Sequence, residues 1–376
     1  MTDPQPPDPP APDDRGIVDR YLGRLTPAGM SRRTAMIRQA LRAEHHRHRA
    51  RWVMALASVV LLGAAAGGWG WVQHQRVERA RAAGEELFYA MKGLELQVAQ
   101  LRLTVEERAA YRTQQDDLAR RYRDYLERLG IYSSATPAEV QLVYRVIHRL
   151  GESELNVPTE FVQEVRRYIQ RWMRNDRLRD ALARAAAEGY GPKVADALLQ
   201  HDLPPEFFFL ALQESNFKTE AVGPSTRFGI AKGMWQMLPG TAMEYGLQTG
   251  PLVGQRRPDP ADERHDFEKS TTAAAQYLRD IYRTDAQASG LLVIASYNWG
   301  QTRVLRLIRS LPESPRERNY WRLLTQYRDR IPQETYDYVL SVVSAAVIAE
   351  RPEYFGFTFS SPLPADTAVW AAPAGT

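Results

Sequence analysis

The 376 residues include no cysteine, so the chain has no disulfide, no thiol nucleophile and no cysteine metal site. A chain without cysteine can work in either redox compartment, so its location has to be inferred from other features. A strong excess of one charge is also lacking, because 49 lysines and arginines balance 45 aspartates and glutamates to a net +4. Since no nucleic-acid-binding motif occurs either, we expect no nucleic acid among the partners.

Alternating strand patterns of useful length are missing between residues 75 and 350, where apolar residues recur at helical spacing instead. Segments such as TPAEVQLVYRVIHRL and VPTEFVQEVRRYIQRWM open with proline, which is typical of a helix start. The length and the hydrophobic content of 44% are sufficient for one or two domains with buried cores. We therefore predict an all-α protein.

One long uncharged run, WVMALASVVLLGAAAGGWGWV, extends from Trp52 to Val72. Its twenty-one residues are close to the roughly 20 that a bilayer-spanning helix needs. Trp52, Trp69 and Trp71 lie at its two ends, where interfacial aromatic residues concentrate. A buried helix of a soluble domain is the alternative, which an unbroken uncharged run of this length disfavours.

Arginine is distributed unequally around this run. The twenty residues before it hold seven arginines, whereas the twenty after it hold three arginines and one lysine, partly offset by glutamates. The positive-inside bias predicts a cytoplasmic N-terminus and places everything after Val72 across the membrane. Because the basic segment before the run is too long for an ordinary signal peptide, we prefer an uncleaved anchor to cleavage after Ala66.

The stretch LPPEFFFLALQESNFK, Leu203 to Lys218, places a glutamate on a helix stripe that should face a core. Two prolines favour the first helical turn, and Glu214 shares one face with Phe207 and Leu210. Because a carboxylate among apolar side chains loses solvation, its pKa should rise. A carboxyl group still protonated near neutral pH can act as a general acid.

Three further motifs follow in order, namely GMWQM at 233–237, VIASYNWG at 293–300 and PQETYDYV at 332–339. Together with Glu214 and Ser215, they resemble the catalytic domain of family 1 lytic transglycosylases, the SLT domain of glycoside hydrolase family 23. The likeness is greatest to the membrane-bound D-type members. Each motif alone is weak, whereas four motifs in the family's order are specific.

The resemblance implies a lysozyme-like helical domain that cleaves the MurNAc–GlcNAc β-1,4 bond of peptidoglycan without water and leaves 1,6-anhydroMurNAc products. In that scheme Glu214 is the single acid and base, the substrate's N-acetyl oxygen supports the developing charge, and no cofactor or metal is needed. The supporting or substrate-binding residues would be Ser215, Met234, Gln236, Tyr297, Asn298 and Tyr338.

Tyr297 is expected to hydrogen-bond the Glu214 carboxylate, Met234 to line the cleft floor, and Gln236 to bind the glycan. Two roles stay open for each of the others. Ser215 bonds the glutamate or the substrate, or it is an ordinary serine at a helix end. Asn298 holds a sugar acetamido group or the local turn.

Tyr338 either reaches the catalytic site or is a core tyrosine, and Glu334 would favour the positive end of its helix dipole. The acidic residues between 259 and 268 are expected to be solvated or capping groups. If one of them faced Glu214, hydrolysis through an activated water would be possible, as in a lysozyme-like hydrolase of the same fold. A non-catalytic peptidoglycan-binding subunit of an envelope-spanning machine is the third reading.

These inferences divide the chain into five parts: a cytoplasmic segment 1–50, a transmembrane helix 51–73, a helical periplasmic spacer 74–189, the catalytic domain 190–355 and a tail 356–376. In the spacer, apolar residues recur at four-three spacing, from Leu87 and Met91 to Leu101 and Val105. This seam fits a helix packed on residues 114–129 of the same chain or a dimeric coiled coil. The expected partners are peptidoglycan strands, the inner membrane, and an envelope or secretion machine.

Overall fold

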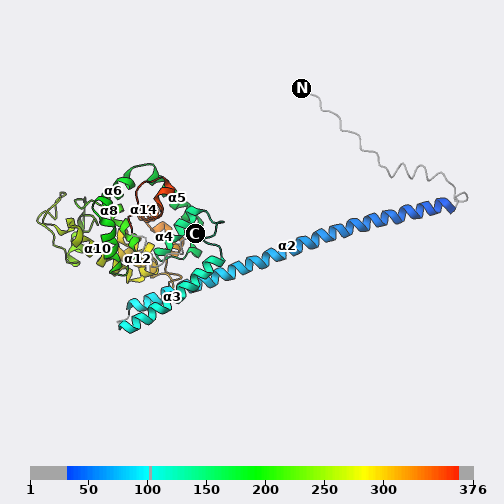
Figure 1. The fold of residues 1–376 in the computed structure, drawn as a ribbon, viewed down its shortest axis with the longest axis horizontal. Coiled ribbons are helices and arrows are strands. Elements are labelled where there is room, and N and C mark those ends of the chain that lie inside the picture. The colour runs from blue at the N-terminus through cyan, green and yellow to red at the C-terminus, as the bar shows by residue number, and fades with distance from the viewer. Residues whose placement is uncertain (1–31, 101–103, 364–376) are drawn as a thin grey trace, which may run out of the picture. The chain divides into compact units, whose positions relative to one another are not determined.

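The computed structural model describes residues 32–100 and 104–363, and helices dominate it (Figure 1). Predictions for residues 1–31, for Leu101 and for the tail beyond 363 lie outside these described residues. The chain divides into two compact units, Met1–Arg76 and Val77–Thr376. The described part contains two short strands beside its many helices, so the all-α prediction is confirmed.

In the first unit, the described residues belong to helix α2 (Arg32–Gln100), which continues into the second unit. The described chain has one helix long and apolar enough to cross a membrane, Met54–Glu95, whose most apolar 18-residue window has a mean hydropathy of 1.6. The large apolar side chains of this run are exposed, with Leu56 and Leu62 at 69% and 71%. Length and composition therefore agree with the predicted span.

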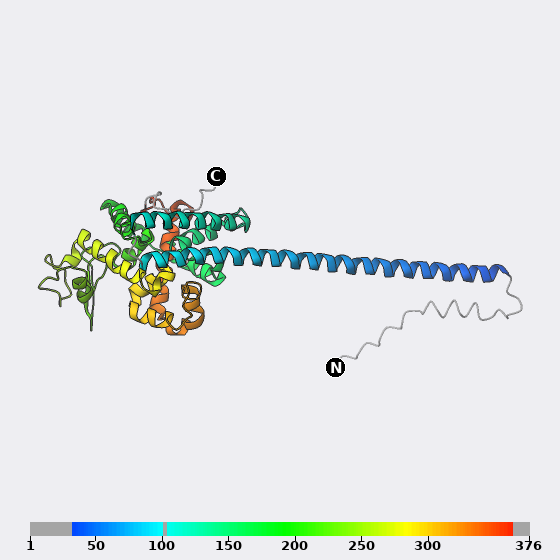
Figure 2. The ribbon, with the colours of Figure 1, turned by 90° about the horizontal axis from the view of Figure 1, so that it is seen from below.

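The second unit begins with the C-terminal part of α2, which packs against α3 (Val105–Arg128; Figure 2). Phe88 and Met91 of α2 form a small core with Tyr122 and Leu126 of α3. A capping box opens α3, in which the Thr104 side chain accepts from the Glu107 backbone and the Glu107 carboxylate accepts from Thr104. Two explanations were given for the apolar residues that recur from Leu87 onward. The structure agrees with the first, in which this helix packs against the next helix of the same chain.

One large core unites the helices that follow. They are α4 (Ala138–Arg149), α5 (Thr159–Met173), α6 (Arg177–Ala187), α7 (Tyr190–Leu199), α8 (Phe208–Ser215), α9 (Pro239–Glu244), α10 (Phe267–Tyr282), α11 (Gly290–Trp299), α12 (Gln301–Ile308), α13 (Tyr320–Tyr327) and α14 (Gln333–Glu350). Short 3₁₀ turns lie between them at Glu154–Asn156, Pro205–Phe207, Glu263–His265, Asp285–Ala288 and Arg328–Arg330, and a further one follows α14 at Pro352–Phe355.

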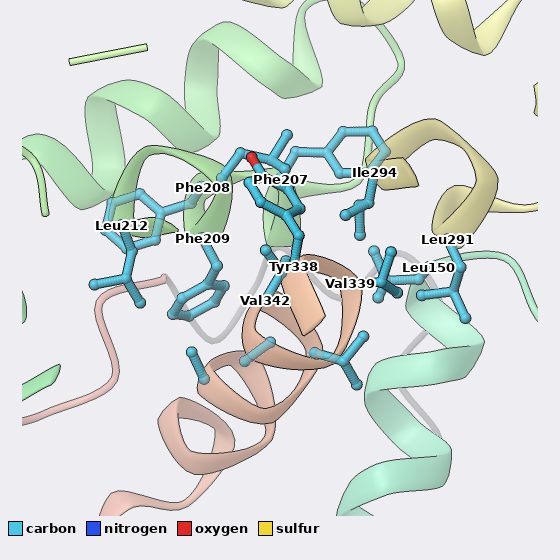
Figure 3. Close-up of a cluster of buried hydrophobic side chains, with 14 of the residues drawn as sticks. Leu150, Phe207, Phe208, Phe209, Leu212, Leu291, Ile294, Tyr338, Val339 and Val342 are labelled. Atoms are coloured by element: carbon cyan, nitrogen blue, oxygen red, sulfur yellow. The ribbon is translucent and has the colours of Figure 1, made fainter. Parts of the chain in front are cut away.

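Helix α14 is at the centre of this core and contacts α4, α5, α8 and α11. From Tyr338 to Ala349 all but one of its residues are buried, as expected for a helix that is apolar on every side. Figure 3 shows Phe207, Phe208 and Phe209 in one buried cluster with Tyr338, Val339 and Val342 of α14. The core runs without a break from Leu142 to Phe357, so it crosses the predicted boundary between spacer and catalytic domain at residue 190.

A small antiparallel hairpin, β1 (Val222–Thr226) and β2 (Gly229–Lys232), follows α8. Its base is fixed by buried charges, because the fully buried Arg264 side chain pairs with Asp262 and donates to backbone carbonyls of β2 and of the following turn. Lys232 is equally buried and donates to the Leu252 carbonyl at 2.9 Å. These contacts hold the hairpin and the loop before α10 together.

Candidate active site

Glu214 lies in the last turn of α8, next to the point where the helix ends. Asn216 closes the helix in the left-handed conformation at φ 53°, which asparagine tolerates better than most residues. Phe207 and Leu210, which share the stripe of Glu214, are fully buried. Glu214 itself is only half-buried, so the apolar stripe ends at a carboxyl group that solvent can still reach.

Burial raises the pKa of Glu214 from 4.5 to about 7, because the apolar surroundings disfavour the charged form. A hydrogen bond from Tyr338 acts in the opposite direction and favours the carboxylate. The negative charge of Glu334 adds to the increase. The group is therefore poised between its acid and base forms near neutral pH, as the sequence predicts.

Tyr338 is the side chain that touches the glutamate, and its hydroxyl donates to Glu214 Oε1 at 2.7 Å. The tyrosine is 5% exposed and belongs to the core of α14, so both alternatives for this residue hold together. In Figure 3 it rises from α14 toward α8 with its oxygen at the tip. Burial, together with the nearby Glu214 charge, holds the pKa of Tyr338 well above its usual value, so the hydroxyl keeps its proton.

Tyr297 makes a different contact from the one predicted. Its hydroxyl donates to the Trp235 backbone carbonyl at 2.7 Å, and Tyr338 takes the place expected for it at Glu214. A phenol has one proton to donate, and the turn of the GMWQM motif presents a carbonyl within reach of it. Tyr297 still lies near enough for the Glu214 charge to raise its pKa, after the larger effect of burial.

Ser215 and Met234 connect the first two motifs. The Ser215 hydroxyl donates to the Met234 carbonyl at 2.8 Å and accepts from the Lys218 backbone at 3.1 Å, so of its two roles it takes the structural one. The Met234 side chain is fully buried. It therefore has no exposed surface in the structure, and its expected place at the cleft floor stays a prediction.

Gln236 braces the same turn through its amide nitrogen, which donates to the Gly233 carbonyl at 2.8 Å and to the Ala221 carbonyl at 3.3 Å. The residue adopts the left-handed region at φ 48°. Its amide oxygen lies beside Gly223, where a Cβ atom would come within 2.9 Å of it. Glycine at that position therefore leaves room for this side chain.

Asn298 joins two helices, because its Oδ1 accepts from the Thr335 hydroxyl at 2.8 Å. This bond ties the end of α11 to the first turn of α14. The oxygen thus serves the fold, while the expected contact with a sugar acetamido group stays a prediction for the amide nitrogen.

The acidic residues before α10 have structural partners. Asp262 and Asp266 cap the helical turns that follow them, as predicted, while Asp259 accepts from the Leu252 backbone at 2.7 Å. Asp259 and Asp262 are nevertheless buried and not solvated, at 3% and 1% exposure.

The carboxylate that acts on Glu214 is Glu334, which is exposed and precedes Tyr338 by one helical turn on α14. The sequence interpretation assigned Glu334 to the helix dipole alone. The spacing of four residues, which places Glu334 and Tyr338 on one helix face, was the available signal.

Residues 195–319 match the family model of the transglycosylase SLT domain. The membrane-bound lytic murein transglycosylases D of Escherichia coli K12 and of Escherichia coli O6:H1 are each 28% identical to the chain over 206 residues, which is 54% of this chain and 40% of the relative. The chain thus spans about two fifths of the length of the curated relatives it matches. No solved structure gives a match. The region that carries Glu214 and the second and third motifs is therefore a transglycosylase SLT domain.

Proposed function

We propose that the protein is a lytic transglycosylase that cleaves the MurNAc–GlcNAc β-1,4 bond of peptidoglycan and leaves 1,6-anhydroMurNAc ends. The observation that carries the proposal is Glu214, a half-buried carboxyl group with a pKa raised to about 7 inside an SLT domain. At neutral pH such a group is protonated in about half of the molecules, so it can both give and take a proton.

In the first step, Glu214 protonates the glycosidic oxygen as the bond to C1 of MurNAc breaks. Since Tyr338 already donates to Oε1, the other oxygen is the one that faces the substrate. The substrate's N-acetyl oxygen supports the positive charge at C1. The Tyr338 hydroxyl meanwhile stabilises the carboxylate that remains on the enzyme.

In the second step, the Glu214 carboxylate takes the proton from the MurNAc 6-hydroxyl, whose oxygen forms the new bond to C1. Glu214 is then protonated again, and no water enters the products. The 6-hydroxyl is tethered to the reacting sugar, so its effective concentration exceeds that of free water by orders of magnitude.

A lysozyme-like hydrolase is the second candidate, because ordinary glycosidases place two carboxylates across the bond. Glu334 is the carboxylate whose charge acts on Glu214, but it is exposed at the first turn of α14. The acidic residues before α10 are occupied as caps and buried partners. A single acid and base therefore fits the site better than a pair.

Digestion of purified peptidoglycan with the detergent-solubilised full chain, in heavy-oxygen water, tests the proposal by mass spectrometry. We expect unlabelled anhydro-muropeptides, each lighter by one water than the corresponding lysozyme product, and no release by the Glu214→Gln variant. Labelled reducing MurNAc ends as the main product would identify a hydrolase. Binding without release by the wild type would identify a non-catalytic peptidoglycan-binding subunit.

We further propose that α2 anchors the protein in the inner membrane by a single pass, with a cytoplasmic N-terminus and a periplasmic SLT domain. The apolar stretch after Met54, whose side chains are exposed, supports the membrane span. The excess of arginine before this stretch over the residues after it supports the orientation. A reporter active only in the periplasm should be active after Thr376 and silent after Asp14, and the reverse pattern would contradict the topology. An envelope or secretion machine as partner stays a prediction.

A further inference from the structure

Helices α8 and α14 are joined at both ends of their contact. At one end, the Tyr338 hydroxyl of α14 donates a hydrogen bond to Glu214 of α8. At the other end, Glu206, in the 3₁₀ turn that leads into α8, and Glu350, the last residue of α14, both bind Arg149. The order of these contacts means that the two helices run antiparallel.

Arg149 ends α4 and inserts its guanidinium between the two carboxylates. Its Nε donates to Glu206 Oε1, its Nη2 donates to Glu350 Oε2, and its Nη1 donates to Glu350 Oε1 at 3.2 Å. The Arg149 side chain is 14% exposed and that of Glu206 only 3%. The pair with Glu350 is bidentate and therefore geometrically strict, while the single bond to Glu206 is the less solvated of the two.

The partners of Glu206 are few, since its second oxygen, Oε2, is buried without a hydrogen-bond partner among the described residues. Loss of Arg149 would leave a buried carboxylate without the positive charge that offsets its desolvation. Glu350 differs, because Arg145, one turn earlier on α4, approaches its Oε1 at 3.3 Å as well. Arg149 is therefore the residue that connects the start of α8 to the end of α14.

The segment between these two contacts is tightly packed. Phe208, Phe209 and Leu212 of α8 are at most 1% exposed, as are Val339 and Val342 of α14 (Figure 3). The interlocked side chains set how the two helices approach each other, and the polar contacts at both ends add directional constraints on their register. The arginine contact lies two helical turns from Glu214, so a shift at one end is carried to the other.

We propose that Arg149 is a positioning residue of the active site, which sets the register of α8 against α14 and thereby holds the Tyr338 hydroxyl on Glu214. Arg149 lies outside residues 195–319 that match the SLT family model. The inference rests on the proposed function only for its kinetic consequence, because the register itself can be measured without activity.

A double-mutant cycle with the full chain tests the kinetic part on soluble peptidoglycan fragments. Arg149→Lys is expected to lower kcat about tenfold in the wild-type background with little change in KM, since small misplacements of catalytic groups are costly. In the Tyr338→Phe background, the same substitution should lower kcat less than about twofold, because the contact it protects is already gone. Equal losses in both backgrounds would overturn the proposal.

Arg145→Met is the matched control, because it removes an arginine of α4 that touches Glu350 but not Glu206. It should leave kcat within about twofold in both backgrounds. If Arg149→Lys fails to fold, a triple variant takes its place in the cycle. This variant combines Arg149→Met with Glu206→Gln and Glu350→Gln, so that all three charges are removed together.

The register of α8 against α14 can also be tested by measuring the free energy of unfolding of variants. The coupling free energy between Glu214→Ala, which removes the acceptor, and Tyr338→Phe, which removes the donor, is measured by urea unfolding and should fall when Arg149→Lys is added. A coupling that Arg149→Lys leaves unchanged would overturn the proposal even if the wild-type protein released no product. Inactivity of the wild type would refute the proposed function alone, so the two failures are distinguishable.

Discussion

Replacement of Glu214 by glutamine should make the fold more stable above pH 7 while it abolishes cleavage. The folded protein holds the pKa of Glu214 at about 7, against an ordinary value of 4.5. At about 1.36 kcal/mol per pKa unit, the difference of some 2.5 units corresponds to a ceiling of about 3.4 kcal/mol. Because Glu214 is half-buried, we expect about 1–3 kcal/mol after the screening by solvent.

The sign follows from proton binding. Between pH 4.5 and 7 the unfolded chain has released the Glu214 proton while the folded protein still binds it. Folding stability therefore falls as the pH rises through this window, and the loss is complete above it. Below about pH 4 both states are protonated, so the carboxyl group carries no such penalty there. Glutamine cannot ionise, and its amide oxygen can still accept from Tyr338.

Urea unfolding of the full chain in detergent at pH 4 and pH 8 measures the effect. The Glu214→Gln variant should exceed the wild type at pH 8 and match it closely at pH 4. Glu220→Gln, which changes an exposed glutamate in the following turn, is the control and should show no such difference. An equal difference at the two pH values would refute the idea that burial of this carboxyl group raises its pKa.

Three further substitutions distinguish residues that affect catalysis from residues that only stabilise the fold. Tyr338→Phe removes the bond that lowers the pKa of Glu214, so kcat should fall about tenfold and the alkaline limb of kcat/KM should move to higher pH; an unmoved limb would contradict this. Tyr297→Phe, which loses the Trp235 carbonyl, should cost about 1 kcal/mol of stability, with unchanged products and an unmoved limb. Asp262→Asn leaves Arg264 buried without its counter-charge and should cost about 3–5 kcal/mol in urea unfolding; a loss below about 1 kcal/mol would argue against this buried pair.

The sequence pattern predicted the helical class, the long apolar stretch and the raised pKa of Glu214, because each depends on local spacing or on a contiguous motif. It was less informative about where side chains point. Gln236 was predicted to bind the glycan, and Ser215 either to bind the glutamate or substrate or to be an ordinary helix-end serine. Each lies beside backbone carbonyls that no helix or strand satisfies, and those carbonyls accept from them. The hydrogen bond to Glu214 that was expected of Tyr297 comes from Tyr338 for the same reason, since a motif gives residue types without the acceptors that surround them.

The buried ion pairs could not be predicted from the sequence by the same reasoning. Arg149 reads as one of many solvated arginines on a helix, and its partner Glu350 follows some two hundred residues later. Asp262 was expected to be a solvated or capping group, and its burial went unpredicted because composition alone does not reveal the arginine that neutralises it after folding. Pairings of this kind depend on how distant helices meet, and no local period encodes that.

The unbroken core between Leu142 and Phe357 limits how this SLT region can be moved between proteins. A fragment that begins at residue 190 would lack α4 and α5, and with them core side chains such as Val146, Phe161 and Ile169, and it would uncover the side of α14 that these two helices contact. Such a fragment would carry every motif of the family and still tend to aggregate. The unit that gene fusion or truncation has to preserve is therefore wider than the one that a motif search delimits.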